Sequence, residues 1–210
     1  MSKVYVGIQA RLGSTRLPKK TSMPFGDCDS LIEYVYSQWQ KKLPNYHIVI
    51  LAPRGECEDP FWVKINSICE VFYGDDNNLL KRYSDFAEAY DASIIVRATG
   101  DNPFVHKELV LMSLDAYSVE GVEYLSSKSD DGCNVPQGLG VEVFSIEALK
   151  RVSASTDECE QEHVSEAFTN SQLVECGYLT DPFKAGSMKL SETCLTLDHL
   201  HQYNLLRGLI

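Results

Sequence analysis

Short apolar segments separated by helical patterns are the feature that most limits what this chain can fold into. Residues 4–8, 48–51, 71–73 and 94–96 are apolar runs, β-branched or aromatic and too short for helices, so they predict buried strands. Helical segments with capping residues at their start lie between them, at 31–42, 59–69 and 79–90. This alternation requires crossover connections, and near-continuous apolar strands fit a sheet covered on both faces. We therefore expect an α/β fold with a mostly parallel central sheet and helices on both faces.

The alternation loosens after Asp101-Asn102-Pro103. We expect Asp76 or Asn77 to cap the 79–90 helix, and Ser145 to cap a short helix that ends at 151. Further strands are expected at 122–125, 141–144, 173–178 and 194–197, and further helices at 107–119, at 160–170 and after Asp198. The stretch 126–137, rich in Ser, Asp, Gly and Pro, predicts a loop or flap. Without an internal repeat or a linker, residues 1–210 are expected to form one domain.

Charge and composition exclude several classes of protein. The formal net charge of -11 argues against a general nucleic-acid binder, which would carry a basic surface. No stretch approaches the ~20 apolar residues that span a bilayer, and no signal peptide precedes the first strand, so no membrane partner is expected. The 7 cysteines form no C-x-x-C pair and are odd in number, which disfavours a disulfide framework or a zinc site. A cytoplasmic protein with reduced thiols fits best.

The loop after the first strand concentrates positive charge. Arg11, Arg16, Lys19 and Lys20 lie close together in it, with Gly13, Ser14 and Thr15 between them. In an open α/β sheet, ligands bind outside the carboxyl ends of strands, where this loop begins. Arginine forks and backbone amides suit phosphate oxygens, so the loop predicts a polyphosphate site, although an exposed basic loop is the alternative. Neither the Walker spacing nor the G-x-G-x-x-G spacing is present.

A second polar turn, Arg97-Ala98-Thr99-Gly100-Asp101-Asn102-Pro103, follows the strand at 94–96 and therefore also lies at a carboxyl edge. A carboxylate beside bound phosphates is the usual ligand of Mg²⁺, which makes Asp101 a candidate metal ligand. The alternative is a turn held by an Asx hydrogen bond. Asp198, at the end of 194–197, is either a second metal ligand or a helix N-cap, and the two roles can coexist.

Other polar residues have weaker functional interpretations. A lone histidine such as His163 is more often structural than a ligand contact, and the acidic pair Asp130-Asp131 fits simple solvation of a loop. His199 and His201 are two residues apart and do not share a helical face, so we do not expect them to bind a metal.

Taken together, these segments resemble the cytidylyltransferases that activate acidic sugars as CMP-sugars. The family pattern Q-A-R-x-G-S-T-R-L-P-G-K is matched by residues 9–20, and R-x-T-G-D-x-P by Arg97 to Pro103. E-H-V appears at 162–164, L-T-V-D is approached at 195–198, and the acidic pattern G-x-x-D-D-x-L-x-R-Y is approached between Gly74 and Tyr83. Order and spacing agree over nearly the whole chain. The resemblance is strongest to the group that includes the spore coat polysaccharide biosynthesis proteins F, similar to acylneuraminate and Kdo cytidylyltransferases.

The resemblance implies a Rossmann-like nucleotide-diphospho-sugar transferase fold and a reaction of CTP with an acidic sugar that gives a CMP-sugar and pyrophosphate. Mg²⁺ would be the cofactor, held by Asp101 and Asp198. Catalysis would rest on Arg11, Arg16, Lys20 and Asp101. Nucleotide contacts would come from Ala10, Arg11, Gly13, Ser14, Thr15, Arg16, Lys20, Arg97, Thr99 and Gly100. Sugar contacts would come from Gln137, Glu142 and His163, and a monomer and a homodimer both stay open.

Two positions depart from the family pattern. Lys19 stands where relatives place glycine, and Gly140 stands where G-L-D-V-E-V-F carries aspartate. The missing carboxylate leaves open a nucleotide-binding homologue with weak or no catalysis. Two further alternatives are a transferase for another nucleotide and acceptor, and an interaction subunit of a surface-polysaccharide pathway.

Overall fold

The structure is a computed structural model that describes residues 3–155 and 164–210. Its strands are β1 (Val4–Gln9), β2 (His47–Pro53), β3 (Val71–Gly74), β4 (Ile94–Thr99), β5 (Tyr124–Ser126), β6 (Glu142–Ser145) and β7 (Cys176–Tyr178). Its α-helices are α1 (Leu31–Lys42), α2 (Pro60–Asn66), α3 (Leu79–Tyr90), α4 (Lys107–Glu120), α5 (Ile146–Ser155), α6 (Val164–Thr169) and α7 (Leu200–Arg207). Short 3-10 helices η1 (Lys20–Ser22), η2 (Arg54–Glu56), η3 (Ser129–Asp131) and η5 (Leu190–Glu192) lie in the connections.

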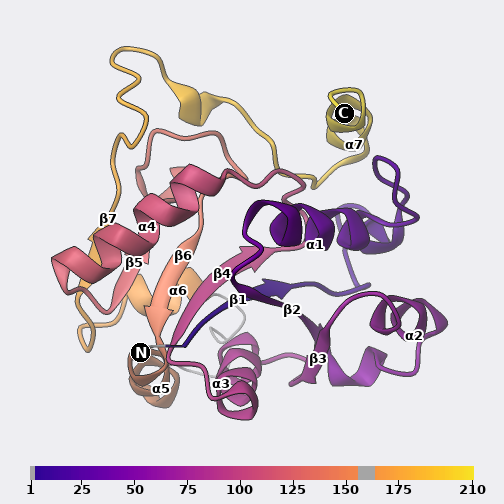
Figure 1. Cartoon of the computed structure of the whole chain (residues 1–210), viewed down its shortest axis with the longest axis horizontal. Helices are drawn as coiled ribbons and strands as arrows, with labels where there is room; N and C mark the ends of the chain where they lie inside the picture. Colours follow the sequence, from indigo (N-terminus) through magenta and orange to yellow (C-terminus); the bar gives the residue numbers. More distant parts are fainter. Residues whose placement is uncertain (1–2, 156–163) are drawn as a thin grey trace.

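All these strands belong to one sheet in the order β3-β2-β1-β4-β6-β5-β7 (Figure 1). Only β6 runs antiparallel to its neighbours, β4 and β5, and the other pairs are parallel. This confirms the predicted mostly parallel sheet. From β1 the chain builds outward to β3, then returns to place β4 on the other side of β1. The strand order therefore reverses between β1 and β4, which is where open α/β sheets bind their ligands.

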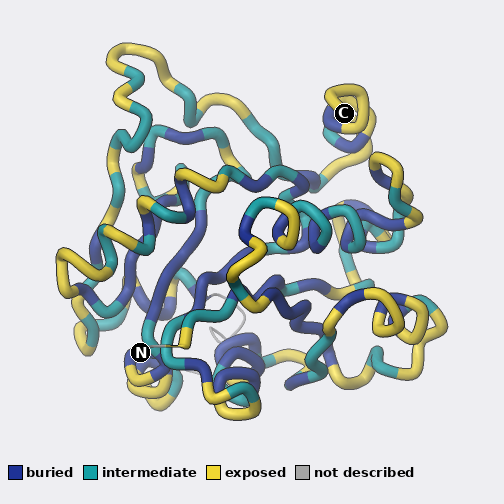
Figure 2. Tube along the Cα trace, in the orientation of Figure 1, coloured by how far each residue is buried: buried dark blue, intermediate teal, exposed yellow. Residues whose placement is uncertain are grey.

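Helices cover both faces of the sheet, as predicted. On one face Val6 and Ile8 of β1 pack in a cluster with Trp39 of α1 and Trp62 of α2. The opposite face packs β-strand residues against α3, α5 and α6, with Phe86 fully buried. Figure 2 shows the central strands largely buried, while residues on the outer sides of the helices are exposed. The core therefore forms two apolar layers that hold the strand ends rigidly in place.

Side-chain caps start most of the helices. Ser30 accepts a hydrogen bond from the Glu33 amide at 3.3 Å, and Ser145 accepts one from the Ala148 amide at 3.1 Å, as expected for Ser145. The cap of α3 is Asn78, which accepts from the Lys81 amide at 2.8 Å, so the prediction of Asp76 or Asn77 was wrong.

The predicted strand at 194–197 is not formed. Cys194 makes an isolated bridge with Gln137, and the Leu197 amide donates to the Asp101 carbonyl at 2.9 Å. The reason is that the partners of this segment are a loop and a turn rather than a strand. Asp198 does not cap α7 either, because His199 takes that place and Gln202 accepts from the His199 amide. The carboxylate of Asp198 is left for other partners.

Several other boundaries differ modestly from expectation. The strands expected at 122–125 and 173–178 are shorter, and the helix expected from 59 to 69 ends at Asn66. The first part of the helix expected at 160–170 lies outside the described residues. Among the described residues, the cysteines are all free thiols, and no helix combines the length and apolarity needed to cross a membrane.

Candidate active site at the carboxyl edge of the sheet

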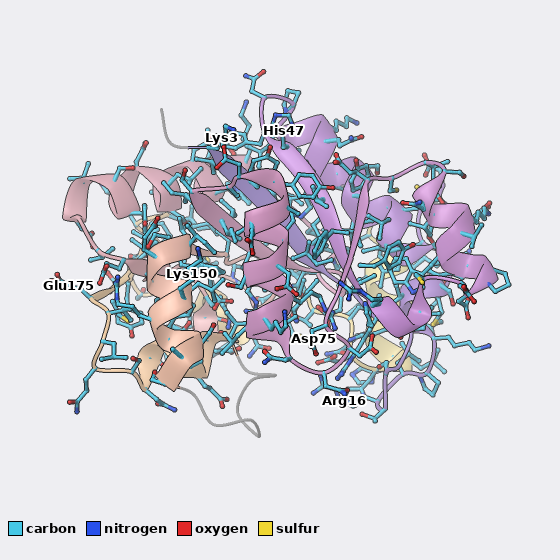
Figure 3. All side chains as sticks on the ribbon, turned by 90° about the horizontal axis from the view of Figure 1, so that it is seen from below. Lys3, Arg16, His47, Asp75, Lys150 and Glu175 are labelled. Atoms are coloured by element: carbon cyan, nitrogen blue, oxygen red, sulfur yellow. The ribbon has the colours of Figure 1, made fainter. Side chains whose placement is uncertain are left out.

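The loop after β1 is fixed at both ends by hydrogen bonds. Its Leu12 amide donates to the Glu56 carboxylate at 3.0 Å, and the Thr21 hydroxyl donates to the Arg11 carbonyl at 2.6 Å. Lys19 adopts a left-handed conformation with φ 59°, which explains why the family pattern has glycine there. That turn leads into η1 and directs Lys20 back toward the sheet. Figure 3 shows Arg16 and Asp75, which follow β1 and β3, on the side opposite Lys3 and His47 at the amino ends.

The turn after β4 lies directly against the end of β1. The Gly100 amide donates to the Gln9 carbonyl at 2.8 Å, and a Cβ at Gly100 would lie 3.1 Å from the Ala10 Cβ. This close approach favours glycine and brings Asp101 beside the β1 loop.

Lys20 joins the two predicted metal carboxylates. Its ammonium donates to Asp101 at 2.7 Å and to Asp198 at 2.8 Å, and Arg16 donates to the same Asp198 oxygen at 2.8 Å. The structure thus brings together side chains that are far apart in the sequence. The Lys20 side chain is only 12% exposed, so its charge is held in place by these carboxylates rather than by water.

The two carboxylates fit the preference of Mg²⁺. Because both approach one ammonium, they converge on a place that already suits a cation. Among the described residues, no cluster of three or more His, Cys, Asp or Glu side chains forms a metal site by itself. Mg²⁺ typically uses one or two carboxylates together with substrate phosphates, so this donor set is adequate when a triphosphate supplies the rest.

A second, buried ionic network lies behind this site. Arg97 donates through Nε to the Gln9 side chain at 2.9 Å and through Nη1 to Glu142. The other Glu142 oxygen accepts from the hydroxyls of Tyr124 and Ser165, each at 2.8 Å. Burial favours the neutral acid, but Arg97, Lys128 and these hydroxyls outweigh burial and hold the pKa of Glu142 below its ordinary value. Burial raises the pKa of Tyr124, so its hydroxyl stays a donor.

Two cavities open at this edge of the sheet. The larger, about 760 Å³, is lined by every residue predicted to bind nucleotide, namely Ala10, Arg11, Gly13, Ser14, Thr15, Arg16, Lys20, Arg97, Thr99 and Gly100. The smaller, about 400 Å³, is lined by Asp198, Gln137 and Glu142 among others. Both cavities share Asp101, Arg97 and Thr99 in their walls. Asp101 therefore stands where a group in one cavity would meet a group in the other.

Some lining residues had no role in the sequence analysis. Lys128 and Asp130 line both cavities, and Ser165 lines the larger one. No sequence motif marks Lys128. Its place follows from the sheet, because β5 runs in the same direction as β4 and the loop after β5 therefore emerges at the same carboxyl edge. Asp131 was expected only to solvate its loop, but its carboxylate also accepts a hydrogen bond from the Ser126 hydroxyl at 2.5 Å. His163 lies outside the described residues.

Solved structures define the general class. The chain superposes on a cytidylyltransferase from Leptospira borgpetersenii with a TM-score of 0.84 and 26% identity, covering 99% of this chain and 86% of that one. It shares its fold with a CMP:2-keto-3-deoxy-manno-octonic acid synthetase complexed with CTP, with a TM-score of 0.71, 13% identity and coverage of 99% and 98%. The fold is thus the Rossmann-like fold of nucleotidyltransferases.

Sequence comparisons define the family. The model of the cytidylyltransferase family matches residues 6–184. The chain is 32% identical to the spore coat polysaccharide biosynthesis protein SpsF of Bacillus subtilis, covering 100% of this chain and 87% of that protein. It is 31% identical to an uncharacterised protein of Methanocaldococcus jannaschii, covering 94% of this chain and 79% of that protein. The chain belongs to the cytidylyltransferase family and is a nucleotidyltransferase that uses CTP, which confirms the resemblance drawn from its motifs.

Proposed function

We propose that this enzyme transfers the cytidylyl group of CTP to a hydroxyl of an acidic sugar and releases pyrophosphate, with Mg²⁺ as cofactor. The observation that carries the proposal is the pair of cavities that meet at Asp101. The larger one presents the cations of the β1 loop, as a triphosphate requires, and the smaller one has room for a sugar. The name of the Bacillus subtilis relative supports an acceptor used for surface polysaccharide. We expect the reaction to occur in the cytoplasm.

Each group of the site has a role in this reaction. Arg11, Arg16 and Lys20 would neutralise the β- and γ-phosphates and the departing pyrophosphate. Asp76, Asn77 and Leu79, at the wall that α3 supplies, would face the base and ribose. The sugar hydroxyl, held in the smaller cavity, would attack the α-phosphorus as the bond to pyrophosphate breaks and the hydroxyl loses its proton. Positioning of the two reactants supplies much of the rate.

Asp101 and Asp198 would hold the metal, which would supply Lewis-acid stabilisation of charge at the phosphates. Lys20 now bridges these carboxylates, so we expect it to turn toward the triphosphate when CTP and Mg²⁺ bind.

An Asp101→Asn variant tests this assignment. The amide keeps the size of the side chain but removes the charge shared by both cavities, so we expect pyrophosphate release to fall by roughly 100-fold or more, the scale of losing one transition-state electrostatic contact. The assay follows pyrophosphate with CTP, Mg²⁺ and a panel of sugar acids. Asp115→Asn is the matched control, because Asp115 is exposed on α4 and lines neither cavity. Full activity of Asp101→Asn would remove Asp101 from the metal site.

A further inference from the structure

A lysine stands in the wall that the two cavities share. Lys128 follows β5 and lines both the larger and the smaller cavity. Its ammonium donates to the Ser165 hydroxyl at 2.7 Å and lies 3.6 Å from a Glu142 oxygen. An ammonium has three donors, and the Glu142 contact is longer than a hydrogen bond. The side chain keeps 26% exposure, which leaves the charge accessible from the cavities.

The charges of the smaller cavity make this lysine important. Its described lining carries the carboxylates of Asp101, Asp130, Asp198 and Glu142. The described lining of this cavity includes one arginine, Arg97, and one lysine, Lys128, and the Arg97 guanidinium is buried against Gln9 and Glu142. Lys20 binds Asp101 and Asp198, and Arg97 binds Glu142, so these two cations already serve the carboxylates of the site. An anionic acceptor beside those carboxylates would be repelled unless a further cation met its charge. Lys128 is the cation in position to do so.

Gly140 explains how Lys128 comes to be there. A Cβ at Gly140 would overlap the Ser127 carbonyl oxygen and would lie 2.5 Å from the Lys128 Cα, so this backbone packs directly on the glycine. Hydrogen bonds hold it there: the Ser127 amide donates to the Val141 carbonyl at 3.0 Å, and the Val141 amide donates to the Ser127 hydroxyl at 2.9 Å. Where the family pattern often has aspartate, this chain thus has space for the 127–128 backbone.

We propose that Lys128 binds the carboxylate of the acceptor, and that Gly140 is the specificity-determining position that lets Lys128 approach the smaller cavity. The inference rests on the proposed function, since it concerns the acceptor of that reaction. Lys128 then selects acidic acceptors over neutral ones of the same shape.

The test compares free sugar acids with their methyl esters, which differ only in the charge that Lys128 would bind. The probes are N-acetylneuraminate and 2-keto-3-deoxy-manno-octonate with CTP and Mg²⁺, and pyrophosphate release is measured. We expect wild type to favour an acid over its ester by tenfold or more in kcat/KM. Lys128→Met should raise the KM for the acid by tenfold or more, leave the KM for CTP within about twofold, and abolish the preference. Lys128→Arg should restore part of it, and Lys150→Met, at an exposed residue of α5, should change nothing.

A Gly140→Ala variant tests the second part. Because its Cβ meets backbone, segment 127–128 must shift, and we expect the KM for the acid to rise as in Lys128→Met. Gly208→Ala is the control, because its Cβ would meet nothing closer than 3.4 Å. Should Gly140→Ala fail to fold, Lys128→Met still decides the matter.

Each contrary result has a distinct meaning. A wild type that CTP and Mg²⁺ do not stabilise against heat would overturn the proposed function. A wild type that CTP stabilises but that favours neither acid over its ester would overturn this inference alone. The inference about Lys128 would also be overturned if Lys128→Met left the KM for the acid unchanged. It would likewise be overturned if Lys128→Met raised the KM for CTP instead, because the ammonium would then bind the phosphates.

Discussion

At the scale of single residues, Arg97 and Glu142 form a buried ion pair between β4 and β6. The Glu142 side chain is only 2% exposed, and its oxygens accept from Arg97, Tyr124 and Ser165. Removing one partner of a buried ion pair leaves the other charge uncompensated, which costs about 3–5 kcal/mol. We expect Glu142→Gln to lower the free energy of unfolding by that order at pH 7, measured by urea denaturation.

The same pair predicts a pH dependence. The pKa of Glu142 is lowered in the folded state, so its stabilisation is fully present above the ordinary glutamate pKa of about 4.3 and is lost as pH falls through the lower folded value. The difference in unfolding free energy between wild type and Glu142→Gln should therefore shrink below about pH 4. A difference that stayed constant from pH 7 to pH 3 would show that folding leaves the pKa of Glu142 unshifted, which would contradict a stabilised carboxylate in this ion pair.

Single residues also show what the sequence could and could not predict. The cations of the β1 loop and Asp101 were recognisable because motif and strand order place them at one edge. The family motif predicted that Glu142 contacts the sugar. Its buried hydrogen-bond partners come from β4, β5 and α6, and residue spacing in the sequence could not predict them. Lys128 carried no motif and lay in a stretch read only as a loop or flap. Contacts between distant segments depend on packing, which no local pattern encodes.

At the scale of elements, N-cap residues fix the positions where helices begin, and a cap that lies away from both cavities takes no part in the reaction. Ser30 is 2% exposed and accepts from the Glu33 amide at the start of α1, while lining neither cavity. Loss of such a cap typically costs about 1 kcal/mol. We expect Ser30→Ala to lower the midpoint of thermal unfolding by about 2–4 °C, the shift usual for this size. Ser30→Thr should recover part of the loss, and KM for CTP should not change. An unaltered midpoint would mean that the cap contributes nothing.

Elements with strong local patterns were predicted well, and those defined by distant partners were not. The strands β1, β2 and β4 are apolar, central and correctly located. The segment 194–197 has a strand-like composition, but a loop at Gln137 and the turn at Asp101 took its hydrogen bonds. These hydrogen bonds hold the segment where Asp198 reaches Lys20. The segment whose strand was wrongly predicted therefore supplies one carboxylate of the site.

At the scale of the whole molecule, the reversal of strand order between β1 and β4 creates the site. It sets two polar loops side by side at the carboxyl edge, and the rest of the sheet serves to hold them. The formal charge of -11 is spread over the chain, while the cations of the β1 loop gather on the wall of the larger cavity. A local cationic wall in an acidic protein favours a small anionic ligand over a polyanion such as nucleic acid.

Thermal unfolding with each of the four nucleoside triphosphates and Mg²⁺ tests whether the larger cavity is a site for CTP. A ligand that binds only the folded state stabilises by about 2.7 kcal/mol at 100 times its Kd, which for a chain of this size corresponds to several degrees in Tm. We predict that CTP with Mg²⁺ raises Tm by about 5 °C or more, and that UTP, GTP and ATP raise it much less. An equal or larger shift with another triphosphate, or no shift with CTP, would contradict a site built for CTP.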